Sequence, residues 1–227
     1  KVRVASGIDW IFEQVEEAII LEDDCLPHPT FFRYCEELLS FYRNDQRVAM
    51  ISGNNFLQGF QASDNSYYFS NHTHGWGWAT WRDRWQKDYD VEMKAWPYVR
   101  DEGRIENWFE TKVEQKYWSR TFEKVYKGRI DTYDYQWFFA VLLNGRHSIL
   151  PNVNLVSNIG FGSEATHTIN SSPMANLPVK EMLFPLKHPQ KMVVSRSSDA
   201  FFFDKFCNVP VHKRIIKKLL RFLRVYI

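Results

Sequence analysis

A short apolar run that ends in three consecutive acidic residues constrains the fold of this chain more than any other feature. Residues 18–21 (AIIL) are all apolar, and residues 22–24 (EDD) follow directly. An uninterrupted apolar run is typical of a strand that is covered on both faces. A helical pattern over about 30–43 and a second apolar run at 48–52 come next. A strand, a helix and a strand this close together predict a βαβ unit with two parallel strands and a right-handed crossover.

The rest of the pattern predicts an α/β domain with an irregular end. Apolar residues at helical spacing predict a helix over 4–15, and residues 66–85 form an irregular aromatic stretch. We expect a partial domain over 1–170, an irregular extension over 171–211 and a basic amphipathic helix over 212–227. Within the domain, the further expected elements are helices at 105–127 and 134–143 and a short strand at 148–150.

Composition limits the protein class but not the reaction. The 227 residues suit one sizeable domain. The three cysteines lack the spacing of a zinc site, and so sparse a set argues against a disulfide scaffold. This predicts a reducing, cytoplasmic compartment. The sequence contains no run of eighteen apolar residues, so we expect no membrane-spanning helix.

The three acids repel one another unless a positive group lies among them. In open α/β sheets, ligands bind at the carboxyl ends of the strands, and Glu22, Asp23 and Asp24 follow such an end. Carboxylate oxygens favour Mg²⁺ or Mn²⁺, whose open positions suit water and a diphosphate. The alternative is a solvated acidic turn without a ligand.

Three motifs occur in a fixed order: the passage IILEDDCLPHPTFF, then Gly75-Trp76-Gly77-Trp78, then the segment YDYQW at 133–137. Over about residues 17–165 this order resembles GT-A glycosyltransferases of the N-acetylglucosaminyltransferase I type and their bacterial relatives. The resemblance implies a GT-A, Rossmann-like, mostly parallel sheet flanked by helices. It also implies a nucleotide-sugar donor such as a UDP-sugar, Mn²⁺ or Mg²⁺ as cofactor, and transfer with inversion.

The resemblance also assigns roles to the acidic residues. It implies that Asp24 binds the metal directly, with Glu22 and Asp23 supporting metal-bound waters or the ribose. It implies that Asp134 is the base that takes the proton of the acceptor hydroxyl. Without the resemblance, Asp134 reads more simply as a helix N-cap. Asp131 and Asp83 are reserve candidates for the base.

The glycine-tryptophan segment is expected to line the substrate site. Its glycines permit close approach of backbone to ligand, and Trp76 is the expected sugar contact. The spacing of Trp78, Trp81 and Trp85 instead predicts a buried helical stripe, although Trp78 belongs to the matching motif. His167 is a candidate second metal ligand, with an ordinary structural histidine as the alternative.

The resemblance also leaves a gap before the metal strand. GT-A domains begin with strands that hold the nucleotide, and only about seventeen residues precede the acidic strand here. We expect a fragment, or a partner that supplies the missing strands. An exposed sheet edge would then favour self-association.

The last residues carry a different signal. Residues 212–227 contain six basic residues and no acid, with apolar residues on the opposite helical side. This predicts an interfacial helix in peripheral contact with an inner membrane, where a lipid-linked acceptor would lie. A terminal helix packed on the domain is the alternative. The acidic body argues against nucleic acid as a partner.

Three functions remain open from the sequence. The first is a metal-dependent glycosyltransferase acting on a glycan or lipid-linked acceptor. The second is a carbohydrate- or nucleotide-binding module without turnover. The third is a metal-dependent phosphoester hydrolase that uses the same acids.

Overall fold

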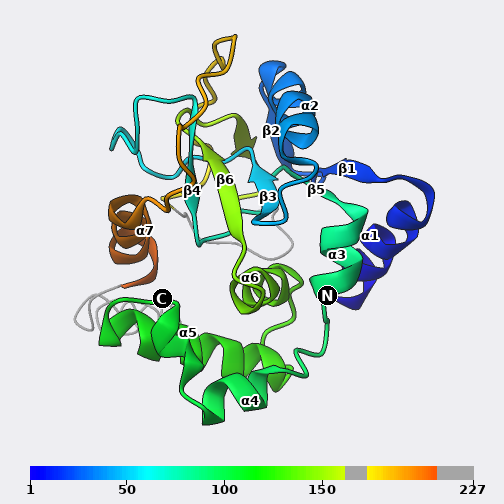
Figure 1. Cartoon of the computed structure of the whole chain (residues 1–227), viewed down its shortest axis with the longest axis vertical. Coiled ribbons are helices and arrows are strands. Elements are labelled where there is room, and N and C mark those ends of the chain that lie inside the picture. Colours follow the sequence, from blue (N-terminus) through cyan, green and yellow to red (C-terminus); the bar gives the residue numbers. More distant parts are fainter. Residues whose placement is uncertain (162–172, 209–227) are drawn as a thin grey trace, which may run out of the picture.

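The computed structural model describes residues 1–161 and 173–208 of the chain. Its main sheet has five strands in the order β1-β5-β3-β6-β4. Helices lie around this sheet (Figure 1). The strands are β1 (Glu17–Ile20), β3 (Val48–Ser52), β4 (Tyr67–Ser70), β5 (Trp78–Trp81) and β6 (His147–Pro151).

The strand directions correct the expected mostly parallel sheet. The expected strands at 18–21 and 48–52 are present as β1 and β3, but β5 lies between them. Both pair antiparallel with β5, so they run in the same direction without being neighbours. β4 and β6 are also antiparallel, and only β3 and β6 form a parallel pair. The protein is therefore an α/β fold with a mixed, mostly antiparallel sheet.

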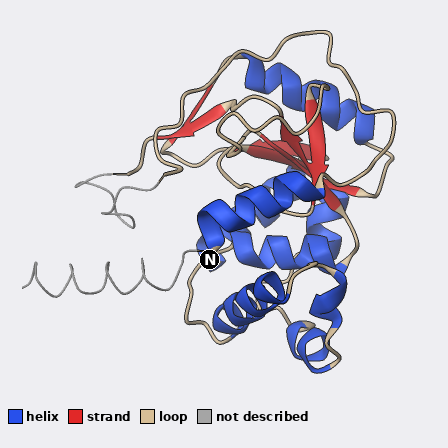
Figure 2. Ribbon diagram, turned by 90° about the vertical axis from the view of Figure 1, so that its left-hand side faces the viewer, coloured by secondary structure: helices blue, strands red, loops and turns tan. Residues whose placement is uncertain are grey.

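Helices cover both faces of this sheet (Figure 2). Every residue of β3 is buried, as expected for a strand with two covered faces. Val48 and Ile51 pack in the cluster formed with α2 (Thr30–Tyr42). Ala49 and Met50 pack in the cluster formed with α1 (Val2–Gln14) and α6 (Asp134–Leu143).

A second, helical core lies below the sheet in Figure 1. The expected long helix over 105–127 is instead two elements, because Thr111 starts a new helix with a capping box to Glu114. Aromatic side chains fill this core. Its elements are α4 (Trp96–Asp101), η1 (Arg104–Asn107), α5 (Lys112–Tyr126), part of α6, and η2 (Phe203–Cys207).

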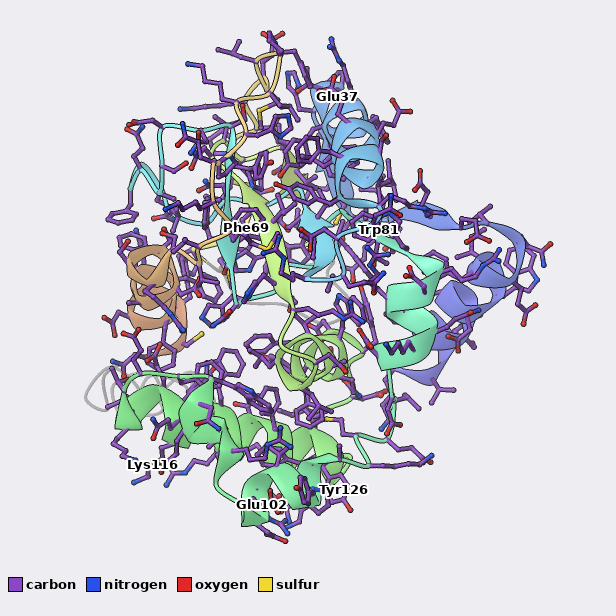
Figure 3. The ribbon with its side chains drawn as sticks, viewed as in Figure 1. Glu37, Phe69, Trp81, Glu102, Lys116 and Tyr126 are labelled. Carbon is purple, nitrogen blue, oxygen red and sulfur yellow. The ribbon has the colours of Figure 1, made fainter. Side chains whose placement is uncertain are left out.

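The tryptophans at 78, 81 and 85 are buried as expected, but not as a helical stripe. Trp78 and Trp81 belong to strand β5, and Trp85 lies in α3 (Arg82–Asp88). A spacing of three and four residues fitted a helix, whereas a strand followed by a helix buries the same three rings. Figure 3 shows Trp81 and Phe69 in the interior of the sheet region.

A two-stranded antiparallel sheet positions the acidic segment. Strand β2 (Cys25–Pro27) pairs with β7 (Val156–Asn158), which places Cys25 opposite Asn158. This pairing brings the residues just before β2 to the loop just after β7. The segment 173–208 returns over the body, where Met182 and Leu186 join the main core and α7 (Arg196–Phe202) packs near β4.

Two predicted features lie outside the described residues. These are His167 and the basic helix over 212–227. Among the helices that the structure does describe, none has the length and apolar character to cross a membrane.

Candidate active site

Two of the three predicted acids gather just beyond the end of β1. One side-chain ligand atom from each of Glu22, Asp24 and Cys25 lies within 4.8 Å of the others. A tight turn, in which the Cys25 N–H donates to the Glu22 carbonyl at 3.1 Å, folds the segment so that these side chains meet. Asp23 is exposed and outside this group. We call Glu22, Asp24 and Cys25 the acid cluster.

Asp24 is held in place by the strand end opposite it. The Asn158 Nδ2 donates to Asp24 Oδ1 at 2.9 Å, and the Ile159 N–H donates to the Asp24 carbonyl at 2.9 Å. The Asn158 Oδ1 in turn accepts from the Gly160 N–H at 2.9 Å. One oxygen of the Asp24 carboxylate is therefore oriented by Asn158.

Gly160 allows this loop to approach Asp24 closely. A Cβ atom at position 160 would lie 2.0 Å from Asp24 Oδ2 and 2.7 Å from its carboxyl carbon. Such contacts are too short for any side chain, so a larger residue at 160 would displace either the loop or the carboxylate. Gly160 therefore has a steric role beside the acid cluster.

The carboxyl group of Glu22 has a raised pKa. Burial raises its pKa to about 7, and the neighbouring Asp24 charge adds to the rise. Tyr133 opposes the shift, because its hydroxyl donates to Glu22 Oε1 at 3.3 Å. The charge of Asp134 also raises the pKa of Glu22, which connects the base candidate to the acid cluster.

Asp134 is the first residue of α6, and Tyr133 occupies the N-cap position. The simple N-cap reading of Asp134 therefore does not describe this helix. The Asp134 side chain is exposed, yet desolvation by the surrounding protein raises its pKa. Hydrogen bonds from the backbone N–H groups of Asp134 and Tyr135 oppose the rise. The positive end of the helix also favours the ionised form.

The donor atoms of the acid cluster suit a hard divalent cation. Glu22 and Asp24 supply oxygens, the ligand type that Mg²⁺ and Mn²⁺ prefer. Cys25 is a poor thiolate ligand here, because burial raises its thiol pKa to about 12. In the described part of the chain, no lysine or arginine forms an ion pair with Glu22, Asp23 or Asp24. Among residues 1–161 and 173–208, no side-chain cation offsets the repulsion within the acid cluster.

The glycine-tryptophan segment lies against the same region. Gly77 has φ of +74°, and a Cβ there would lie 2.7 Å from Val156 Cγ2. The Trp76 N–H donates to Asn54 Oδ1 at 3.0 Å, which fixes the segment to the end of β3. Trp78 is only 1% exposed, so in this structure it offers no surface to a ligand. Gly75 and Trp76 remain partly exposed.

Asp134, Gly75 and Trp76 share one aromatic cavity of about 210 Å³. The Trp76 ring meets Phe56 edge-on, with centroids 5.3 Å apart, and meets Phe161 at 5.5 Å. Histidines at 72 and 74 also line this cavity, and burial lowers the pKa of each, to about 4 and about 3. Both imidazoles are therefore neutral near pH 7. Of the described residues that line the cavity, Asp134 is the one with an acidic side chain.

The reserve base candidates lie elsewhere. Asp131 lies at the surface, where its side chain is 80% exposed. Asp83 pairs with Arg84 at 2.7 Å and accepts from Gln46 at 2.8 Å. Neither residue lines the aromatic cavity.

Sequence reasoning missed three residues that shape the site. Tyr133 was visible beside Asp134, but its bond to Glu22 joins positions 111 residues apart. The β2–β7 pairing brings Asn158 and Gly160 to Asp24. No local sequence pattern predicts this pairing. The Gly-Phe-Gly stretch at 160–162 was the local signal available for Gly160.

A scan against models of known protein families gives no match for this chain. A search of curated protein sequences finds no significantly similar protein. The functional argument therefore rests on the geometry of the site.

Proposed function

We propose that this protein is a metal-dependent glycosyltransferase that moves a sugar from a nucleotide-sugar donor, a UDP-sugar, to a glycan or lipid-linked acceptor with inversion. One observation carries the proposal. Glu22 and Asp24 at the end of β1 and Asp134 at the start of α6 belong to one electrostatic group, with Tyr133 between them. This electrostatic coupling supports a cation-binding role and a base role at one site.

The first function is cation binding by Glu22 and Asp24. A divalent cation held there would neutralise the donor diphosphate and stabilise it as a leaving group. Asn158 orients Asp24, and Tyr133 orients Glu22. Asp23, which is exposed beside them, supports metal-bound water or the ribose in this proposal. His167 remains a candidate additional ligand.

The second function is proton transfer at Asp134. The acceptor oxygen forms a bond to the anomeric carbon while the bond from that carbon to the diphosphate oxygen breaks. The acceptor proton passes to the Asp134 carboxylate. A raised pKa brings a carboxylate closer to working pH and makes it a stronger base, while the helix start keeps it ionised.

The aromatic cavity suits the sugar that lies between these groups. Trp76 is partly exposed beside Asp134 and presents a ring for sugar packing. Gly75 and Gly77 let the backbone approach the ligand. Residues 212–227 add peripheral membrane contact to the proposal, which would bring a lipid-linked acceptor close.

A donor screen tests the proposal directly. The protein is incubated with Mn²⁺ and UDP-, GDP- or CMP-sugars, and released nucleotide is measured, because water serves as a slow acceptor. We expect release from a UDP-sugar that disappears with EDTA and in Asp24→Asn. The exposed variant Asp64→Asn is the matched control and should retain the activity.

The outcomes separate the three functions left open by the sequence. Nucleotide-sugar binding without any release would favour a binding module over the enzyme. Release of inorganic phosphate from simple phosphoesters, with nucleotide sugars left intact, would favour the hydrolase. Either result contradicts the proposed transfer.

A further inference from the structure

A second cavity of the described residues lies outside the candidate active site. It has a volume of about 520 Å³ and shares no lining residue with the aromatic cavity or the acid cluster. This size is within the range of small-molecule sites. We call it the amide cavity, because its lining includes five carboxamide side chains: Asn55, Gln58, Gln61, Asn152 and Asn154.

The amide cavity follows from the one parallel strand pair of the sheet. Strands β3 and β6 run side by side in the same direction, so their carboxyl ends meet at one edge. Asn55 comes three residues after β3 ends at Ser52, and Asn152 comes directly after β6 ends at Pro151. Such an edge is where open α/β sheets bind ligands.

Two buried carboxamides form a fixed floor. The Asn55 Nδ2 donates to the Pro151 carbonyl at 2.7 Å, and the Asn55 N–H donates to Asn154 Oδ1 at 3.1 Å. Among the described residues, the Asn154 Nδ2 donates to the carbonyls of Leu177 and Pro178, each at 3.4 Å. These bonds are at the long limit, so a ligand hydroxyl can replace them at little cost.

Two exposed carboxamides, those of Gln58 and Gln61, form the rim of the cavity. Hydrogen bonds donated by their Nε2 atoms orient them. The Gln61 Nε2 donates to Asp64 Oδ1 at 2.9 Å, and the Gln58 Nε2 donates to the Pro173 carbonyl at 3.0 Å. Within the part of the chain that the structure describes, neither Oε1 accepts a hydrogen bond. Both oxygens remain available to a hydroxyl donor.

An aromatic ring stands beside these amides. Phe60 is 39% exposed, and one face of its ring stacks on Phe201 with centroids 5.1 Å apart and planes 15° apart. This contact fixes the ring before any ligand arrives. An exposed and preorganised phenyl ring can pack against the C–H face of a pyranose.

We propose that the amide cavity binds a neutral oligosaccharide. Carboxamides offer donors and acceptors together, which matches ligands rich in hydroxyl groups. Among the described residues that line the cavity, Lys180 is the one charged side chain, and these residues lack the cluster of cations that an anion site needs. The polar floor disfavours an acyl chain. This inference does not rest on the proposed transferase activity.

Calorimetric titration with cellohexaose, maltohexaose and chitohexaose tests the site on the full chain. We expect at least one of these probes to bind, and we expect Phe60→Ala and Gln61→Ala each to weaken that binding by about 2- to 10-fold. Both residues are exposed, so the folded state should survive the changes. Phe32→Ala removes an equally exposed phenyl ring, 43% exposed, away from the cavity and should leave binding unchanged.

Three results would overturn the proposal. The first is that none of the three probes binds, and the second is that wild type and the Phe60 and Gln61 variants bind equally. The third uses oligogalacturonate as an added anionic probe and is binding of that probe alone, abolished by 0.5 M salt. The last result would identify an anion site at Lys180. Asp24→Asn should keep saccharide binding in this cavity, which separates failure of this site from failure of the acid cluster.

Discussion

Carboxylates are partly or fully buried in two regions of this protein, and the two regions differ in whether a cation pairs with them. Asp88 lies against Arg146 at 2.6 Å, and both side chains are buried, with exposures of 1% and 6%. Glu22 and Asp24 lie against each other instead, and the described residues supply them with no paired cation. Arg146 balances the charge of Asp88, whereas no described residue balances the charges of Glu22 and Asp24.

The difference indicates what each region is for. A guanidinium is always charged, so Arg146 gives Asp88 a permanent partner, which opposes the rise in the Asp88 pKa caused by burial. Acidic groups without a paired cation destabilise the folded state, and proteins tolerate such destabilisation at sites that bind a ligand. The acid cluster is therefore expected to gain stability from a divalent cation, whereas Asp88 is not.

The largest effect should come from breaking the balanced region. Arg146→Met leaves Asp88 buried without a partner, and we expect a loss of about 3–5 kcal/mol in the free energy of unfolding. Urea denaturation followed by circular dichroism measures it. Lys94→Met removes a lysine from an exposed pair with Glu92 and should cost at most about 1 kcal/mol. Equal effects of the two changes would refute the distinction.

The proposed base should affect turnover without affecting metal binding. Asp134→Asn keeps the size of the side chain and removes the proton acceptor, so we expect transfer to fall by about 100- to 10,000-fold. Mn²⁺ affinity should stay within a few-fold of wild type. The comparison requires the donor and acceptor identified in the screen. A variant that keeps full turnover would remove Asp134 from the mechanism.

Steric access to the acid cluster can be tested at one glycine. Gly160→Ala places a methyl group against Asp24, and we expect Mn²⁺ affinity to fall by about 10- to 100-fold. Gly7→Ala is the matched control, because a Cβ at position 7 has no atom within 4 Å. Calorimetry with Mn²⁺ measures both. Unchanged affinity in Gly160→Ala would show that the loop does not set the position of Asp24.

The last comparison concerns pH. The pKa of Glu22 is about 7 in the folded protein against 4.5 when unfolded, so the folded state holds the extra proton between these values. Its stabilising contribution is complete below about pH 4.5 and is lost as the pH rises through about 7. Melting temperatures of metal-free protein from pH 4.5 to 8 should fall less steeply in Glu22→Gln than in wild type. Identical slopes would contradict the assigned protonation of Glu22.

The sequence predicted the local elements of this site better than their arrangement. The strand predicted before Glu22 and the helix predicted to begin at Asp134 are both confirmed, because each depends on a few neighbouring residues. The insertion of β5 between β1 and β3 was not foreseen, since sheet neighbours are decided by contacts far apart in the chain. The same reason hid Asn158, which lies 134 residues from its partner Asp24.

The central claim is that the acid cluster binds a divalent cation. Titration of Mn²⁺ followed by electron paramagnetic resonance measures it directly, because the signal of free Mn²⁺ decreases when the ion is bound. We predict one site in wild type and in the exposed control Asp64→Asn, and an affinity at least about 100-fold weaker in Asp24→Asn. Equal Mn²⁺ binding by wild type and Asp24→Asn would contradict the account.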